Sequence, residues 1–148
     1  AWPLVLAARP QAVLSIAGRM RRTQFPVPVE VLGEVPEEDK PAVLADAHIF
    51  VAPHRGGESM GLVLVEAMAA GTAVVATDLP AFTAVSEGIA ARHVPVADPV
   101  SLAAALVAVL DDDSMREQLQ RLGSARAEDF DTGVVAEQIL GVYQRLLP

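Results

Sequence analysis

Two short apolar runs on either side of a helix-forming segment most restrict how this chain can fold. Residues 49–52 and 73–77 are predicted to be buried strands, and residues 62–70 between them are predicted to form a helix. Gly71 stands just after this helix, at the position where a left-handed residue commonly ends one. Two strands joined by one helix are expected to be parallel, because a parallel crossover needs a connection of this length.

The rest of the chain repeats the same alternation of short strand-like and longer helix-like segments. Asp98 is expected to cap a strong helix with Pro99 at its first position, and no structure is expected for residues 19–28. The fold class expected is α/β, a Rossmann-like parallel sheet with helices on both faces. The other expected elements are strands at 13–17, 29–32 and 94–96, and helices at 4–9, 37–46, 82–86, 102–110, 114–130 and 134–147.

Composition excludes several classes of function. The chain has 148 residues, enough for one domain, and its net charge of -8 argues against nucleic acid or an anionic membrane as an unaided partner. It has no cysteine, which excludes disulfides, thiolate metal sites and thiol nucleophiles. No apolar stretch approaches the roughly 18–20 residues of a spanning helix. No histidines or carboxylates have metal-ligand spacing, so we expect no protein-bound metal.

A glycine-rich loop, followed by two glutamates eight positions apart, is the strongest functional signal. Gly56 and Gly57 follow the strand at 49–52, and Glu58 and Glu66 lie at the mouth and on the second turn of the next helix. Free backbone N–H groups at a helix N-terminus suit a phosphate, whereas carboxylates accept hydrogen bonds from hydroxyl groups. Phosphate donors beside hydroxyl acceptors suit a nucleotide sugar, with Glu58 on sugar hydroxyls and Glu66 on a ribose.

Other polar residues carry weaker signals. His54 and Arg55 precede the loop. A lone histidine at a strand end more often has a structural than a catalytic role, and Arg55 could pair with a phosphate but is at least as well explained as an exposed loop residue. Ser59 has no recognisable His and Asp partners, and neither the dinucleotide nor the Walker glycine motif occurs. The segment 33–40 is either an ordinary strand–helix connection or a pocket for a nucleotide base, and the residues alone leave both possibilities open.

Residues 52–79 together resemble the signature of retaining glycosyltransferases with the GT-B fold, also called group 1 glycosyl transferases. The family pattern has two glutamates separated by seven residues, as Glu58 and Glu66 are here. The resemblance is strongest to the actinobacterial phosphatidylinositol alpha-mannosyltransferases. It covers most of the chain and identifies it with the C-terminal, nucleotide-sugar-binding domain of such enzymes.

The resemblance implies a role for each residue of the motif. Glu58, the catalytic-site residue, would bind hydroxyls of the transferred sugar, and Glu66 would hold the ribose. Val35, Glu37 and Lys40 would surround the guanine. The loop and the start of the helix would face the sugar and the diphosphate through Gly57, Ser59, Met60, Gly61, Leu62 and Val63.

The implied reaction transfers mannose from GDP-mannose to a phosphatidyl-myo-inositol lipid, with retention of the anomeric configuration and without a further cofactor. It implies a cytoplasmic location, at the inner face of the cell membrane for the full-length enzyme. Residues 1–148 would be the donor-binding domain, with the acceptor domain outside this chain, so we expect the isolated chain to be inactive. Two alternatives stay open: a non-catalytic nucleotide-binding domain, and a related transferase that uses a UDP- or ADP-sugar.

Overall fold

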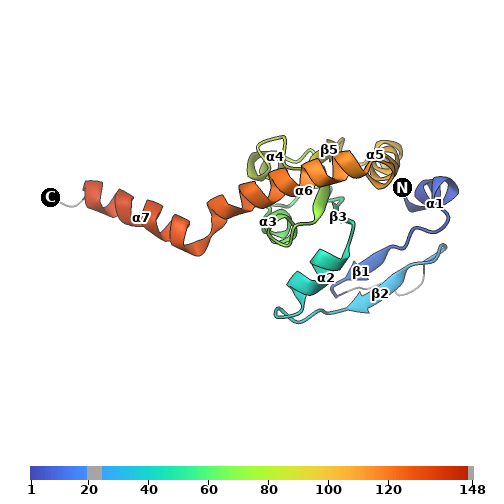
Figure 1. Ribbon diagram of the computed structural model, residues 1–148, viewed down its shortest axis with the longest axis horizontal. Coiled ribbons are helices and arrows are strands. Elements are labelled where there is room, and N and C mark those ends of the chain that lie inside the picture. Colours follow the sequence, from blue (N-terminus) through green and yellow to red (C-terminus); the bar gives the residue numbers. More distant parts are fainter. Residues whose placement is uncertain (20–24, 147–148) are drawn as a thin grey trace.

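The computed structural model describes residues 1–19 and 25–146, and it confirms the alternation of helices and strands (Figure 1). The elements in chain order are α1 (Trp2–Ala8), β1 (Ser15–Ala17), β2 (Glu30–Gly33), α2 (Lys40–Asp46), β3 (Ile49–Ala52), α3 (Leu62–Ala69), β4 (Ala73–Thr77), α4 (Pro80–Val85), β5 (Arg92–Val94), α5 (Pro99–Asp111), α6 (Asp113–Ala127), the short 3₁₀ helix η1 (Glu128–Phe130) and α7 (Thr132–Leu146).

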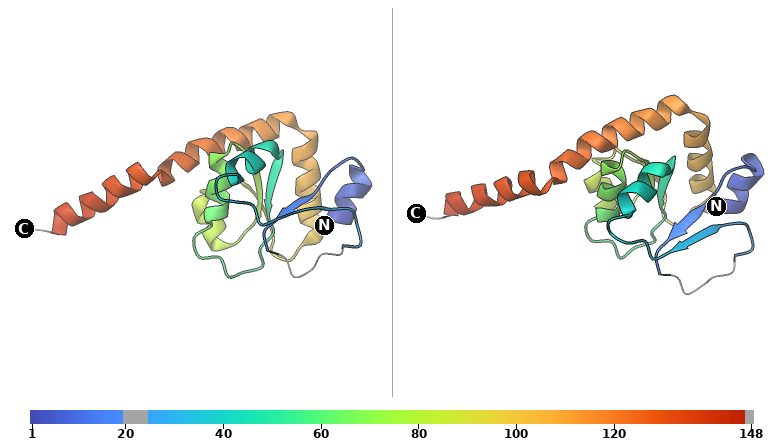
Figure 2. Two further views of the ribbon diagram at one scale, coloured as in Figure 1. Left: turned by 90° about the horizontal axis from the view of Figure 1, so that it is seen from below. Right: turned by 60° about the horizontal axis from the view of Figure 1, so that its bottom comes forward.

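The described strands form two separate parallel sheets. In the larger sheet β4 lies between β3 and β5, with Ile49 opposite Ala73 and Val75 opposite Arg92. The smaller sheet pairs β1 with β2, and its register shifts between Ile16 and Ala17. Figures 1 and 2 show this pair set apart from the larger sheet, with α2 beside it. The single sheet expected from the sequence is therefore divided in two.

The central strand β4 is buried along its whole length. Successive side chains of a strand point to opposite faces, so β4 contributes to two cores. Val74 and Ala76 belong to a core with residues of α3 and α4, and Ala73 and Val75 belong to a second core with residues of α1 and α5. Helices thus cover both faces of the larger sheet, as the sequence predicted.

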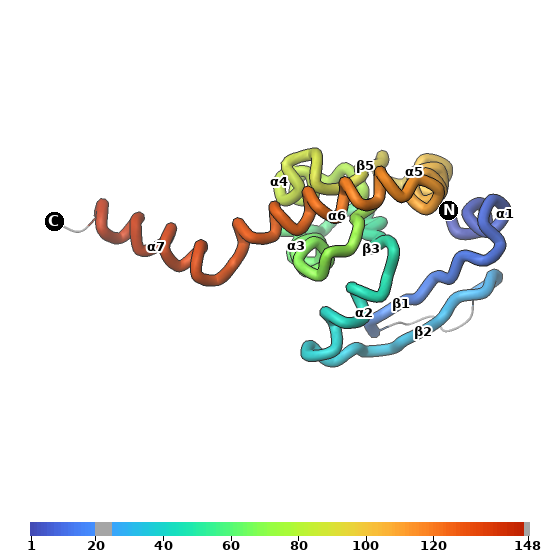
Figure 3. The backbone as a smooth tube through the Cα atoms, viewed as in Figure 1, coloured from blue at the N-terminus to red at the C-terminus, as the bar shows by residue number. Residues whose placement is uncertain are grey.

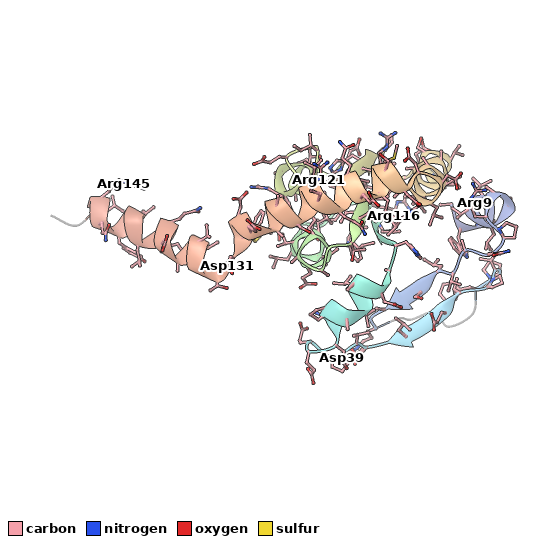
Figure 4. All side chains as sticks on the ribbon, viewed as in Figure 1. Arg9, Asp39, Arg116, Arg121, Asp131 and Arg145 are labelled. Carbon is pink, nitrogen blue, oxygen red and sulfur yellow. The ribbon has the colours of Figure 1, made fainter. Side chains whose placement is uncertain are left out.

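Helix α6 packs closely on α3, and a glycine permits the approach. A Cβ atom at Gly123 would lie 3.0 Å from Cγ of Met68, which is fully buried. Arg9, which directly follows α1 and is labelled in Figure 4, forms an ion pair with Asp111 at the end of α5. Asp112 then accepts a hydrogen bond from the Met115 N–H and caps α6.

The last helix, α7, extends away from the rest of the domain (Figures 1 and 3). None of its described residues is buried, and Ile139, Leu140 and Tyr143 are each more than half exposed. Asp131 lies at the bend between η1 and α7, where its carboxylate accepts a hydrogen bond from the Gly133 N–H (Figure 4). Within the described residues, no helix is long and apolar enough to cross a membrane.

Prolines are associated with several of the differences between expected and observed boundaries. Residues 37–39 form a turn in which the N–H of Lys40 bonds to the carbonyl of Pro36, so α2 begins later than expected, with Pro41 in its first turn. Pro80 starts α4 two residues earlier than predicted. Strand β5 ends before Pro95, which has no N–H to donate. Within the structureless segment expected at 19–28, residues 20–24 lie outside the described part.

Replacement of Met68 tests the packing of α3 against α6. Met68→Ala should lower the free energy of unfolding by about 2–5 kcal/mol, because it opens a cavity that the surrounding helices fill only partly. Met60, which is 51% exposed in the glycine-rich loop, provides a control: Met60→Ala should change stability by less than about 0.5 kcal/mol. Urea unfolding of both variants measures the difference, and equal losses would contradict the packing described.

Candidate functional site

The candidate site lies at the carboxyl end of the larger sheet. The loop of residues 53–61 leaves the end of β3 and leads into α3, at the edge where open α/β sheets bind ligands. Gly56 and Gly57 are exposed and have positive φ angles of 152° and 79°. The glycine-rich turn is therefore at the surface, as a ligand-binding loop requires, and is not covered by the core.

Gly61 ends this loop and begins α3 in a left-handed conformation, with a φ angle of 82°. A Cβ atom at this position would lie 3.1 Å from Cδ1 of Phe82. Glycine is therefore needed here for two reasons, because a side chain would be strained by its backbone conformation and crowded by α4. The close approach fixes the start of α3 against α4.

The carboxylate of Glu58 caps its own loop. Its Oε1 atom accepts hydrogen bonds from the backbone N–H groups of Ser59, Met60 and Gly61, at 3.1, 3.2 and 2.9 Å. These bonds, from Gly61 first and then Met60 and Ser59, hold the pKa of Glu58 below its usual value, and the nearby imidazole of His54 adds a smaller electrostatic lowering. Glu58 is therefore held in its ionised form.

This cap changes which atoms of the loop are open to a ligand. The N–H groups expected to hold a phosphate are, at three positions, already bonded to Glu58. The N–H groups of Leu62 and Val63 have no acceptor among the described residues. The N–H groups in the first turn of α3 are therefore the donors open to a ligand. The second carboxylate oxygen of Glu58 is the open acceptor. The contacts expected of Gly57 to Val63 with a nucleotide sugar stay predictions.

Glu66 is exposed on α3, near the loop between β2 and α2. Lys40 donates a hydrogen bond of 2.7 Å to Glu37. That bond, with smaller electrostatic contributions from Glu37 and Glu66, raises the pKa of Lys40. Glu66 thus lies within electrostatic reach of Lys40, one of the three residues expected around a nucleotide base. Glu37 is bonded to that lysine, and Val35 lies partly buried before α2. Their role in base and ribose binding stays a prediction.

The structure also shows a cleft that the sequence analysis did not identify. It has a volume of about 450 Å³, opens to solvent, and lies between Met60 of the loop and the start of α7. Arg126 lines it, but its guanidinium group is already engaged by the Val85 carbonyl, Glu87 and Asp129. The other lining residues are Phe130, Val135 and Gln138. They lie more than sixty positions after the loop, so no local motif could have linked them to it.

A model of the family described as "Glycosyl transferases group 1" matches residues 1–112. The chain belongs to this family. It is 49% identical to a phosphatidyl-myo-inositol mannosyltransferase of Mycolicibacterium smegmatis over 114 residues, which are 76% of this chain and 30% of the relative. It is 40% identical to the protein of the same name in Mycobacterium tuberculosis over 156 residues, covering 97% of this chain and 41% of the relative.

Solved structures support the same fold. The sucrose-phosphate synthase of Thermosynechococcus elongatus superposes with a TM-score of 0.79 at 24% identity, over 96% of this chain and 40% of that one. The chain thus spans less than half of each of these proteins. The resemblance to the GT-B transferases and the Rossmann-like fold expected from the sequence are both confirmed.

A comparison of alanine substitutions at Gly61 and Gly71 distinguishes the cost of backbone strain from the cost of steric crowding. Gly61 and Gly71 both have positive φ, but a Cβ atom would meet Phe82 only at Gly61 and nothing within 4 Å at Gly71. Gly71→Ala should destabilise the domain by about 1–2 kcal/mol through its conformation alone, and Gly61→Ala should cost more. Thermal unfolding of the two variants gives the comparison, and an equal loss would mean that Phe82 does not restrict this position.

The capping carboxylate makes stability depend on pH. The pKa of Glu58 is lowered in the folded state, so its contribution is present above the unfolded-state pKa and is lost as pH falls through the folded one. Glu58→Gln should therefore destabilise the domain at pH 7, and the difference from the parent chain should shrink below about pH 4. Urea unfolding of Glu58→Gln and the parent chain, at pH 7 and below about pH 4, measures this difference in stability. A difference that is the same at both would show that the charge contributes nothing.

Proposed function

We propose that this chain is the donor-binding part of a retaining glycosyltransferase that transfers mannose from GDP-mannose to a phosphatidyl-myo-inositol lipid. The name shared by the relatives that are 40–49% identical supports the sugar and the acceptor. The observation that carries the proposal for this chain is the exposed glycine-rich loop between β3 and α3, with Glu58 within the loop and Glu66 on α3.

Different residues of the site are proposed to contact different parts of the donor. The open N–H groups at the start of α3 suit the diphosphate, because the helix dipole and the free donors both favour negative charge there. The second carboxylate oxygen of Glu58 suits a sugar hydroxyl. Glu66 suits the two hydroxyls of a ribose. Lys40, which is within electrostatic reach of Glu66, and its partner Glu37 suit the base.

The chemistry proposed depends on fixed donors and charges. When the bond from the sugar to the diphosphate breaks, negative charge grows on the departing phosphate oxygens. Backbone N–H groups that are already oriented stabilise that charge without rearranging. Glu58, held ionised by its loop, would at the same time orient the sugar through its hydroxyls. A lipid acceptor would place the enzyme at a membrane surface.

Nucleotide binding tests the donor site directly. Isothermal titration calorimetry should show GDP binding more tightly than UDP or ADP. Glu66→Ala should weaken the GDP affinity by about tenfold or more, because a hydrogen bond to a charged group contributes roughly 1.5–3 kcal/mol. Glu117→Ala is the matched control, since Glu117 is an exposed glutamate on α6 and should leave GDP affinity unchanged.

Each outcome has a clear consequence. Tighter binding of UDP or ADP would show that the donor is another nucleotide sugar, and the chain would still be the donor-binding part of a glycosyltransferase. No binding of any nucleotide would favour a domain without a donor site. Equal effects of Glu66→Ala and Glu117→Ala would remove Glu66 from the ribose site.

A further inference from the structure

His54 is held rigidly at the start of the loop of residues 53–61. It follows the end of β3 by two residues, and its carbonyl accepts a 2.8 Å hydrogen bond from the hydroxyl of Thr77 at the end of β4. Its imidazole ring meets the ring of Phe82 edge-on, with centroids 5.1 Å apart and planes at 85°. Both the backbone and the ring of His54 are thus fixed by neighbouring elements.

The two ring nitrogens of His54 have different surroundings. Nδ1 is buried and has no hydrogen-bond partner, and it is the only side-chain polar atom in the described residues with this combination. Nε2 is not among those buried atoms and has no protein partner in the described part of the chain, so it reaches solvent. The ring therefore has one buried nitrogen without a partner and one nitrogen that is open to solvent.

This arrangement selects one tautomer of the neutral ring. A neutral imidazole carries its hydrogen on one nitrogen and leaves the other as an acceptor. A buried N–H without an acceptor is rarer and more costly in proteins than an acceptor that is not fully satisfied. The hydrogen is therefore favoured on Nε2, which makes the exposed nitrogen a hydrogen-bond donor.

The His54 ring lies in the neighbourhood of an acceptor, because Phe82, which it contacts, also approaches Gly61, whose N–H donates to Glu58. The imidazole is near enough to the carboxylate of Glu58 to act on it electrostatically, and one carboxylate oxygen of Glu58 is free of the loop amides. A hydroxyl group both donates and accepts one hydrogen bond, so a fixed donor beside a fixed acceptor matches a hydroxyl. A phosphate oxygen only accepts hydrogen bonds, so it cannot donate to the carboxylate of Glu58.

We propose that His54 is a further donor-site residue, whose Nε2–H donates to a hydroxyl of the transferred sugar while that hydroxyl donates to Glu58. This inference rests on the proposed function and extends it to a residue outside the two-glutamate motif. It predicts that His54 contributes to binding of the sugar moiety alone. The affinity for GDP-mannose should therefore depend on His54, and the affinity for GDP should not.

Calorimetry with GDP-mannose and GDP tests the contact. His54→Leu should weaken GDP-mannose binding by about tenfold and leave GDP affinity unchanged, and His54→Gln, which places an N–H near the position of Nε2, should recover most of the loss. His48→Leu is the matched control, because His48 is an exposed histidine before β3. Equal losses for GDP and GDP-mannose, or no loss in His54→Leu, would overturn the proposal.

A second measurement does not depend on any variant folding. Imidazole ¹⁵N shifts of the unliganded parent chain at about pH 8.5, above the ordinary range of histidine titration, report the tautomer. Hydrogen on Nε2 supports the proposal, and hydrogen on Nδ1 overturns it. If the parent chain binds neither GDP nor GDP-mannose, the proposed function fails; if it binds both and His54→Leu has no effect, only the role of His54 fails.

Discussion

The burial of β4 on both faces is the constraint on which the rest of the structure depends. A strand with no exposed residue must have a helical layer on each side, and its alternating Ala and Val side chains are small enough to admit both layers closely. Its parallel pairing with β3 then requires the crossover helix α3. The loop that begins this crossover is therefore held at the sheet edge, where its amides and carboxylates can face a ligand.

Within that frame, α4 makes the loop rigid. Phe82 contacts the ring of His54 on one side and fills the space next to Gly61 on the other. Thr77, at the end of β4, binds the carbonyl of His54. The site is thus supported by residues of the next strand and helix, which the motif of two glutamates does not include. Rigid support of this kind lowers the entropy lost when a ligand orders the loop.

Helices and strands could be predicted from the sequence where the apolar pattern and the flanking turn residues indicated the same structure. The strand at 49–52 and the strand at 73–77 have the expected bounds, because short apolar runs between turn residues allow few alternatives. The nearness of Glu66 to Lys40 depends on α2 packing against α3, which periodicity cannot show. The sequence could not show that Glu58 accepts three N–H groups at once, because the left-handed turn at Gly61 that gathers them is a property of the folded loop.

The cap also explains how a site for an anionic ligand can contain a carboxylate. An isolated negative charge beside a diphosphate would be repulsive, and the chain as a whole already carries a net charge of -8. Three backbone N–H groups donate to the carboxylate of Glu58 and partly offset its charge. The positive end of the α3 dipole lies in the same place and acts in the same direction. Glu58 can then keep the hydrogen-bonding role of a carboxylate toward hydroxyls, while the nearby N–H groups reduce the repulsion that its charge would exert on a neighbouring phosphate.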